Sequence, residues 1–176
     1  LHDISFDIFP GQRVALVGPT GSGKSTILSL LARFYLPTQG RILLDGIDTR
    51  GVTRQSIANQ VAMVLQQNYL FTGTVRDNLQ IAKGMSGVPF TDEQIYAALE
   101  SMECRDLVEG LPHGLDTTVG GRGSKLSLGQ RQLICFARAL LANPRILILD
   151  EATSAIDTMT EVKIQRSLQR LLSGRT

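Results

Sequence analysis

The stretch from residue 18 to residue 26, Gly-Pro-Thr-Gly-Ser-Gly-Lys-Ser-Thr, constrains this chain more than any other feature of its sequence. It fits the pattern G-x-x-x-x-G-K-[ST], follows the apolar run 13–18, and precedes apolar residues at helical spacing. Glycines let the backbone of such a loop turn so that its N–H groups face one anion, and the following helix start adds partial positive charge. We therefore expect a phosphate-binding loop, below called the phosphate loop, made by Gly18, Pro19, Thr20, Gly21, Ser22, Gly23, Lys24, Ser25 and Thr26.

Two side chains of the phosphate loop suit a triphosphate that is bound together with a metal ion. The Lys24 ammonium can reach the β- and γ-phosphates, and the Ser25 hydroxyl can bind Mg²⁺. A glycine-rich turn with an exposed lysine is the alternative interpretation. The strand expected before the loop and the helix expected after it favour phosphate binding.

Two acids, Asp150 and Glu151, follow the apolar run Ile-Leu-Ile-Leu near the other end of the chain. Ligands of open α/β sheets bind at the carboxyl ends of the strands, which is where these acids are expected. Asp150 would hold Mg²⁺ through water, and Glu151 would polarise an attacking water. A strand that ends in a solvated acidic turn is the alternative interpretation, and the phosphate loop argues against it.

A second polar helix start lies at 125–132, Lys-Leu-Ser-Leu-Gly-Gln-Arg-Gln. Ser127 and Gln130 have the spacing of a capping box, in which each side chain bonds to the other residue's backbone N–H. The Ser127 hydroxyl and the N–H groups of a helix start also suit an anion. Ser127 is therefore either a helix cap, an anion ligand, or both.

The spacing of apolar residues predicts strands that alternate with helices. Strands are expected at 4–8, 13–18, 40–48, 61–67 and 145–151. Helical spacing follows the phosphate loop and the cap positions Thr91, Ser127 and Thr158. This order predicts an α/β fold with a mainly parallel sheet and flanking helices, in one domain that spans 1–176.

Composition excludes several other classes of protein. The 18 Lys and Arg against 16 Asp and Glu leave a net charge of +2, with no dense basic run, so nucleic acid is not an expected partner. Of the two cysteines, Cys135 lies in an apolar helical pattern and is expected to be a buried thiol. No apolar run approaches the ~18 residues of a membrane helix. The chain has no starting Met, which suggests a piece of a longer protein.

Together with Leu-Ser-Leu-Gly-Gln at 126–130, these motifs resemble the nucleotide-binding domain of ATP-binding cassette (ABC) transporters, in the right order over nearly the whole chain. The resemblance implies a P-loop NTPase-type sheet, an N-terminal antiparallel β part and a helical subdomain at about 72–142. It implies ATP and Mg²⁺ as cofactors. Gln66 matches the family's Q-loop glutamine. The resemblance implies that Gln66 binds the metal together with Ser25 and Asp150. It also implies that Gln66 takes part in catalysis with Lys24 and Glu151. Asp157, in Ser-Ala-Ile-Asp, matches the D-loop.

The resemblance also implies partners. Two such domains, identical or different, meet head to tail, and the signature of one chain caps the ATP held by the other. The signature residues here are Ser127, Leu128, Gly129 and Gln130. A transmembrane domain on the same or another chain places the assembly at the cytoplasmic face of a membrane. The segments at 42–50, 70–79 and 117–127 resemble exporters rather than importers.

The chain departs from the family pattern in three ways. Leu128 replaces the first glycine of the signature, and Gly121 stands where exporters often have an acid. The aromatic that stacks on adenine would precede residue 1, and the switch histidine would follow a strand beyond the last helix, so 1–176 is expected to be a fragment of its domain. His2 and His113 fit neither role and are expected at the surface.

Three other functions stay open at this point. A soluble ABC ATPase of DNA repair or translation would carry a coiled-coil insertion or a tandem second cassette, which this sequence lacks. A regulatory cassette with weak hydrolysis would usually have lost Glu151. A P-loop kinase or GTPase leaves the Leu-Ser-Leu-Gly-Gln motif unexplained, and the GTPase motif N-K-x-D is absent.

Overall fold

The structure of this protein is a computed structural model that describes residues 1–65, 68–82, 87–150 and 158–176. At its centre, β3 (Val61–Val64) and β4 (Ile146–Leu149) pair in parallel, with Val61 opposite Ile146 and Val64 opposite Leu149. Strands distant in sequence therefore lie side by side and run parallel, as expected for a mainly parallel sheet. Within the described residues the assigned strands form small two-stranded sheets.

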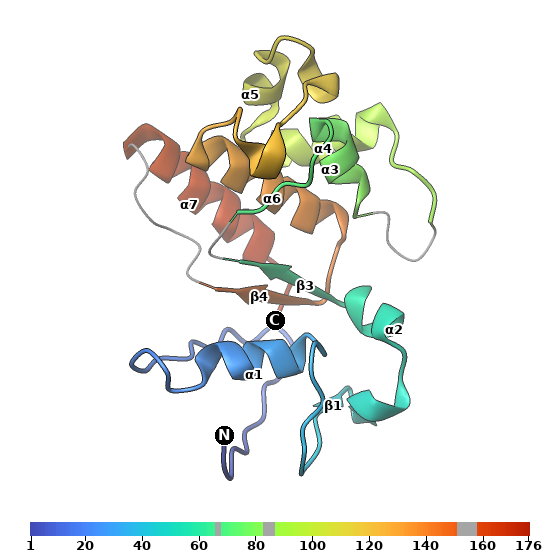
Figure 1. Ribbon diagram of the computed structural model, residues 1–176, viewed down its shortest axis with the longest axis vertical. Helices are drawn as coiled ribbons and strands as arrows, with labels where there is room; N and C mark the ends of the chain where they lie inside the picture. The colour runs from blue at the N-terminus through green and yellow to red at the C-terminus, as the bar shows by residue number, and fades with distance from the viewer. Residues whose placement is uncertain (66–67, 83–86, 151–157) are drawn as a thin grey trace.

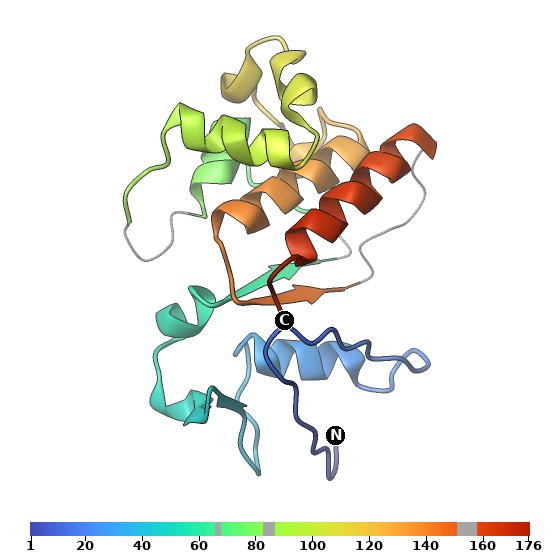
Figure 2. The same ribbon diagram turned by 180° about the vertical axis from the view of Figure 1, so that it is seen from behind.

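The β3–β4 sheet is the middle layer of three (Figures 1 and 2). Side chains alternate across it, because successive residues of a strand point to opposite faces. Val64 and Leu147 belong to a large core that contains the helix α6 (Leu128–Leu141), whereas Val61 and Ile148 belong to a second core against Leu28 and Leu31. Those two leucines lie on α1 (Lys24–Leu31), so α1 and α6 cover opposite faces.

The large core is mainly helical. Phe136 of α6 and Ile164 of α7 (Thr158–Leu172) are both fully buried in it. α3 (Val75–Gln80), α4 (Asp92–Ser101) and α5 (Arg105–Glu109) lie on the side of α6 away from the sheet (Figure 1). The remaining short helices are α2 (Arg54–Ala58), η1 (Thr49–Gly51), η2 (Gly114–Asp116) and η3 (Gly121–Gly123).

Capping boxes begin several of these helices. The Thr91–Gln94 box at α4 and the Ser127–Gln130 box at α6 are both confirmed. Thr74 and Asp77 form a further box at α3, where the pattern T-x-x-D is the signal in the sequence. Each box satisfies backbone N–H groups that a helix start otherwise leaves unpaired.

The strand expected at 40–48 is a hairpin of β1 (Leu43–Leu44) and β2 (Ile47–Asp48). Asp45 and Gly46 join the two strands with φ angles of 50° and 77°. This left-handed pair is the two-residue hairpin turn that Asp-Gly favours. The expected Asp-Gly turn is confirmed.

The strands expected at 4–8 and 13–18 are wrong, because neither segment is paired as a strand. Apolar patterning alone does not make a strand without a neighbour to bond. The free edge of β4 pairs instead with Thr176, whose carbonyl accepts from the Leu147 N–H at 2.8 Å and whose N–H donates to the Arg145 carbonyl at 3.1 Å. Val14 and Val17 stay 47% and 89% exposed.

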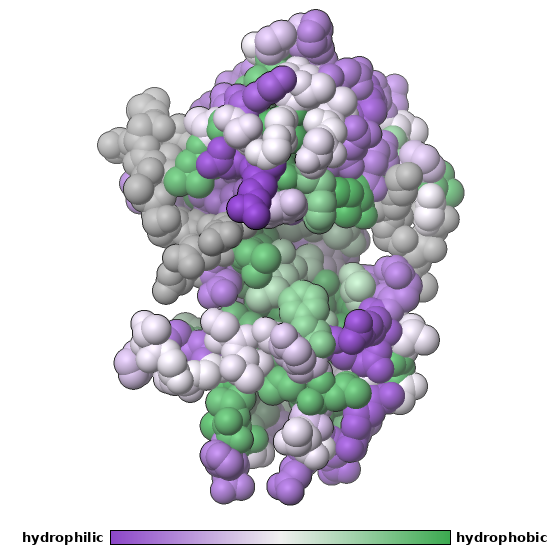
Figure 3. All heavy atoms as spheres, in the orientation of Figure 1, coloured by the Kyte–Doolittle hydropathy of each residue, from purple (hydrophilic) through white to green (hydrophobic). Residues whose placement is uncertain are grey.

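The N-terminal part of the chain carries much of the exposed apolar surface. Figure 3 shows apolar residues, in green, around α1 and below it. The exposed large apolar side chains of this part are Leu1, Ile4, Phe6, Ile8, Phe9, Val14, Val17, Phe34, Tyr35, Leu36, Leu43 and Ile47. Among the helices that the structure describes, none has the length and apolarity to cross a membrane.

Candidate functional site

The phosphate loop turns tightly into α1. Gly21 and Gly23 have φ angles of 84° and 94°, in the left-handed region that glycine adopts without strain. A Cβ on Gly18 would lie 2.8 Å from the Ser22 hydroxyl oxygen, so a side chain there would require Ser22 to shift. Gly23 stands at the N-cap of α1 and provides no side-chain cap, so the first-turn amides keep their capacity to bind an anion.

The Lys24 side chain folds over this loop. Its Nζ donates to the carbonyl oxygens of Gly18 at 2.7 Å and Pro19 at 2.9 Å, and lies 3.5 Å from the Ser22 hydroxyl. The ammonium therefore stands beside the loop, where the phosphates were expected to bind. Ser25 and Thr26 are exposed in the first turn of α1, where their hydroxyls can reach a ligand.

Asp150 lies directly after β4. Its backbone N–H donates to the Val64 carbonyl at 3.0 Å, so the ladder continues one residue beyond the strands. This bond places Asp150 beside Val64, the last residue of β3. Gln66 follows Val64 by two residues in the sequence. Gln66, Glu151 and Asp157 lie outside the described residues.

The donors that the sequence assigned to Mg²⁺ suit that ion, because it prefers hydroxyl, carboxylate and water oxygens. Ser25 offers an exposed hydroxyl and Asp150 a carboxyl group at the strand end. Within the described part of the chain no group of three or more His, Cys, Asp or Glu could form a metal site.

The second candidate element is the start of α6. The Ser127 Oγ accepts from the Gln130 N–H at 3.2 Å, and the Gln130 Oε1 accepts from the Ser127 N–H at 2.9 Å. Across the described residues, no hydrogen bond is recorded for the first-turn amides of Leu128 and Gly129. Ser127 is exposed and Gly129 is buried. Ser127 is thus a helix cap, and the turn around it retains unpaired donors.

The other predictions at single residues have clear outcomes. Cys135 is a buried thiol at 5% exposure, as expected, and burial raises the pKa of its thiol. His2 and His113 are exposed, which confirms their surface placement. Gly121 begins the short helix η3 and is exposed.

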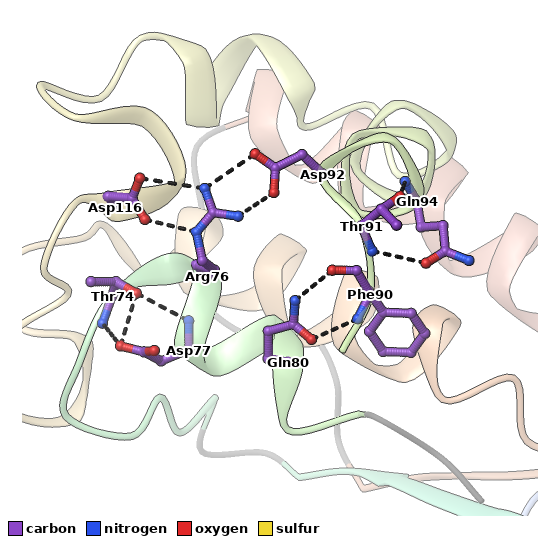
Figure 4. Close-up of polar contacts among 9 residues, drawn as sticks. All are labelled: Thr74, Arg76, Asp77, Gln80, Phe90, Thr91, Asp92, Gln94 and Asp116. Carbon is purple, nitrogen blue, oxygen red and sulfur yellow. Dashed lines mark hydrogen bonds and ion pairs between the residues drawn. The ribbon is translucent and has the colours of Figure 1, made fainter. Parts of the chain in front are cut away.

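Two arginines with structural contacts escaped prediction. Arg76 of α3 pairs with Asp92 and Asp116, which lie 16 and 40 residues away (Figure 4). Arg138 of α6 donates to the Tyr69 carbonyl at 3.2 Å, 69 residues away. No local pattern marks such contacts, because the partners meet only in the folded chain.

Comparison with known proteins decides the family. The family model described as ABC transporter matches residues 1–154. This chain belongs to the ABC transporter family. It is an ATP-binding domain of that family, and the resemblance drawn from the motifs is confirmed.

Individual relatives extend this result. The chain is 49% identical over all 176 residues to an uncharacterized ABC transporter ATP-binding protein, YwjA, of Bacillus subtilis, and covers 30% of it. It is 44% identical to the beta-(1→2)glucan export ATP-binding/permease protein NdvA of Brucella suis and covers 29% of it. The chain thus spans less than a third of these relatives.

A solved structure confirms the fold. It is a bacterial Atm1-family ABC exporter with ATP bound, which matches with a TM-score of 0.85 and 44% identity over 98% of this chain and 30% of that chain. The ABC nucleotide-binding fold is therefore present, although the paired strands of the described residues form small sheets.

Proposed function

We propose that this chain binds and hydrolyses ATP at a head-to-tail interface between two nucleotide-binding domains, and that hydrolysis powers export through an attached transmembrane domain. The observation that carries the proposal is the pair of anion-type helix starts on opposite faces of one sheet. α1 begins behind the phosphate loop and α6 begins at Ser127, and the two helices pack against different cores. Such an arrangement favours a site completed by a second chain.

The phosphate loop supplies binding and charge stabilisation. Backbone amides and Lys24 would neutralise the charge that develops on the phosphates, which is the largest catalytic term in phosphoryl transfer. Lys24 would exchange its bonds to the Gly18 and Pro19 carbonyls for phosphate oxygens. Mg²⁺, when bound, would offset the charge of the phosphates.

Other residues of the chain would complete the chemistry. Ser25, Gln66 and Asp150 would hold the metal ion, and Glu151 would accept a proton from the attacking water. Ser127, Gly129 and Gln130 would act on the ATP of the partner chain, with Leu128 altering the fit. Asp157 would lie at the same interface as part of the D-loop.

The partner in the membrane is proposed from the relatives. NdvA is named as an export ATP-binding/permease protein, and the solved relative as an exporter. Leu65 directly precedes Gln66 in the sequence, and Tyr69 and Phe71 follow it. All three are exposed large apolar side chains, which suits contact with a second domain. We place the assembly at the cytoplasmic face of a membrane.

The domain boundaries are proposed from the family resemblance. We place the helical subdomain at about 72–142, and the packing of α3, α4, α5 and α6 in one core supports this proposal. An adenine-stacking aromatic and a switch histidine would come from residues outside 1–176.

Glu151→Gln in the full-length protein tests the hydrolytic function. The amide keeps the shape of the side chain but loses the base, so hydrolysis should fall by a factor on the order of 10²–10⁴ while ATP binding persists. Phosphate release and fluorescent-ATP titration measure the two quantities. Glu161→Gln, at an exposed position of α7, is the matched control and should match the parent. An unchanged rate would remove Glu151 from the chemistry, and a parent that binds ATP but releases no phosphate would favour a regulatory cassette.

A further inference from the structure

Arg76 joins three separate elements through one guanidinium group (Figure 4). Its Nε donates to Asp116 Oδ1 at 2.7 Å, and its Nη2 lies 3.3 Å from the second oxygen of that carboxylate. The other side of the group pairs with both oxygens of Asp92. Arg76 lies on α3, Asp92 begins α4, and Asp116 ends η2.

Asp116 leads directly into a segment that is bonded to the start of α3. The Val75 N–H donates to the Thr117 carbonyl at 3.0 Å, and the Val119 N–H donates to the Gly73 carbonyl at 2.9 Å. Val75 and Val119 are fully buried, so this antiparallel contact is part of the core. The Arg76–Asp116 ion pair lies next to this antiparallel contact, at the protein surface.

The same segment is tied to the residues just before Ser127. The Lys125 N–H donates to the Val119 carbonyl at 3.1 Å, and the Lys125 Nζ bonds to the Thr118 hydroxyl at 3.0 Å. Lys125 lies two residues before Ser127. A continuous series of direct contacts therefore runs from Arg76 to the turn that begins α6.

Opposite charge favours the Arg76 contacts. The Arg76 guanidinium holds the pKa of the Asp116 carboxyl below its usual range, and the two carboxylates raise the pKa of Arg76. An arginine fork binds carboxylates in a bidentate manner that a lysine cannot reproduce. A lone surface ion pair would contribute little, but this group connects three separate backbone segments.

We infer that Arg76 is a positioning residue for the turn Ser127–Gln130, through Asp116 and the 117–125 segment. The inference rests on the proposed function, in which this turn acts on ATP held by the partner chain. Loss of Arg76 should then weaken the site on the partner's phosphate loop and spare the site on its own.

Mixed dimers of the full-length protein with one working phosphate loop separate these two sites. One chain carries Lys24→Ala, so the only working site combines the other chain's phosphate loop with the first chain's signature. Arg76→Ala is then placed either on the Lys24→Ala chain or on the other chain. Two quantities are measured: phosphate release, and the amount of ADP that vanadate traps per mixed dimer. Trapping needs only one closed site.

We expect roughly a 10-fold loss when Arg76→Ala is on the Lys24→Ala chain, because small misplacement of reacting groups costs this much or more. We expect less than about a 2-fold loss when it is on the other chain. Arg76→Lys should give an intermediate loss, and Arg105→Ala, which removes an exposed pair with Glu109, should give none.

An equal loss in both placements would mean a general structural role and would overturn the inference, as would no loss in either. Ser127→Arg on the Lys24→Ala chain separates this failure from that of the proposed function. If Ser127→Arg abolishes trapping and Arg76→Ala does not, only the inference about Arg76 fails. If Ser127→Arg also leaves trapping unchanged, the proposed action on the partner's ATP fails.

Discussion

Lys24 is the residue on which nucleotide binding depends most directly. Its ammonium is held by the carbonyls of Gly18 and Pro19, so its charge stays at the loop. A flexible lysine in this position can move from carbonyl to phosphate oxygens with little rearrangement of the backbone. Among the side chains of the loop, the Lys24 ammonium is therefore expected to contribute most to ATP binding.

Lys24→Ala should weaken ATP binding by roughly 10- to 100-fold, which is the cost of losing one charged hydrogen-bond donor. Titration with a fluorescent ATP analogue measures the change. Lys163→Ala removes another lysine, which lies on α7 and forms an exposed pair with Asp106 of α5, and should leave the affinity unchanged. Equal affinity in Lys24→Ala and the parent would contradict the assignment of the phosphate loop.

At the scale of elements, local patterns predicted helix starts and turns well. Ser127 with Gln130, Thr91 with Gln94, and the Asp45–Gly46 turn each act within a few residues, so their signals are complete in the sequence. The segment 13–18 shows the limit, because a strand exists only beside a partner that can be far away in the chain. Arg76 escaped prediction for the same reason.

The capping box of α3 should make stability depend on pH. The Thr74 backbone N–H, and then its hydroxyl, lower the pKa of Asp77 in the folded state. A lowered folded pKa contributes stability above the unfolded value near 4, and this contribution is lost as the pH falls through the folded pKa. Asp77→Asn should therefore lower the free energy of unfolding at pH 7, by less than ~1 kcal/mol because the group is exposed.

Thermal unfolding at pH 7 and near pH 3 checks the effect of Asp77→Asn. The difference from the parent should shrink at the lower pH, because the Asp77 carboxyl of the unfolded chain is protonated before that of the folded chain. Asp7→Asn, at an exposed position near the N-terminus, is the control and should change neither curve. A difference that stays constant with pH would mean that the charge of Asp77 has no part in the cap.

At the scale of the whole molecule, the N-terminal layer is less well covered than the helical layer. The C-terminal residues lie between the β3–β4 sheet and the N-terminal segment (Figures 1 and 2). The Gly11 N–H donates to the Thr176 hydroxyl at 2.9 Å, while Val17 nearby in sequence is 89% exposed. We propose that a further strand beside β4 completes this layer in the longer protein.

A version of the chain that continues beyond Thr176 should be more stable and a better ATPase than residues 1–176 alone. Covering ~100 Å² of apolar surface contributes about 2.5 kcal/mol. Thermal melts and phosphate release on both versions measure the two effects. Equal melting temperatures and equal turnover would contradict the proposed strand.

The central claim is that Ser127 acts on the ATP of the partner chain, and mixing two inactive variants tests it most directly. Full-length Lys24→Ala has a broken phosphate loop, and Ser127→Arg places a bulky side chain where phosphate must approach the signature. Every site of either homodimer contains one broken half. A mixed dimer has one site with both lesions and one site with none.

Phosphate release and ATP binding at that intact site are the deciding measurement, with mixed dimers confirmed by pull-down. Action on the partner's ATP predicts that mixing restores activity, up to about one site in two among mixed dimers, and restores tight binding there even if turnover needs two sites. If Ser127 acts within its own chain or only caps α6, both release and tight binding stay at the level of the separate variants, and that result would contradict the proposed mechanism.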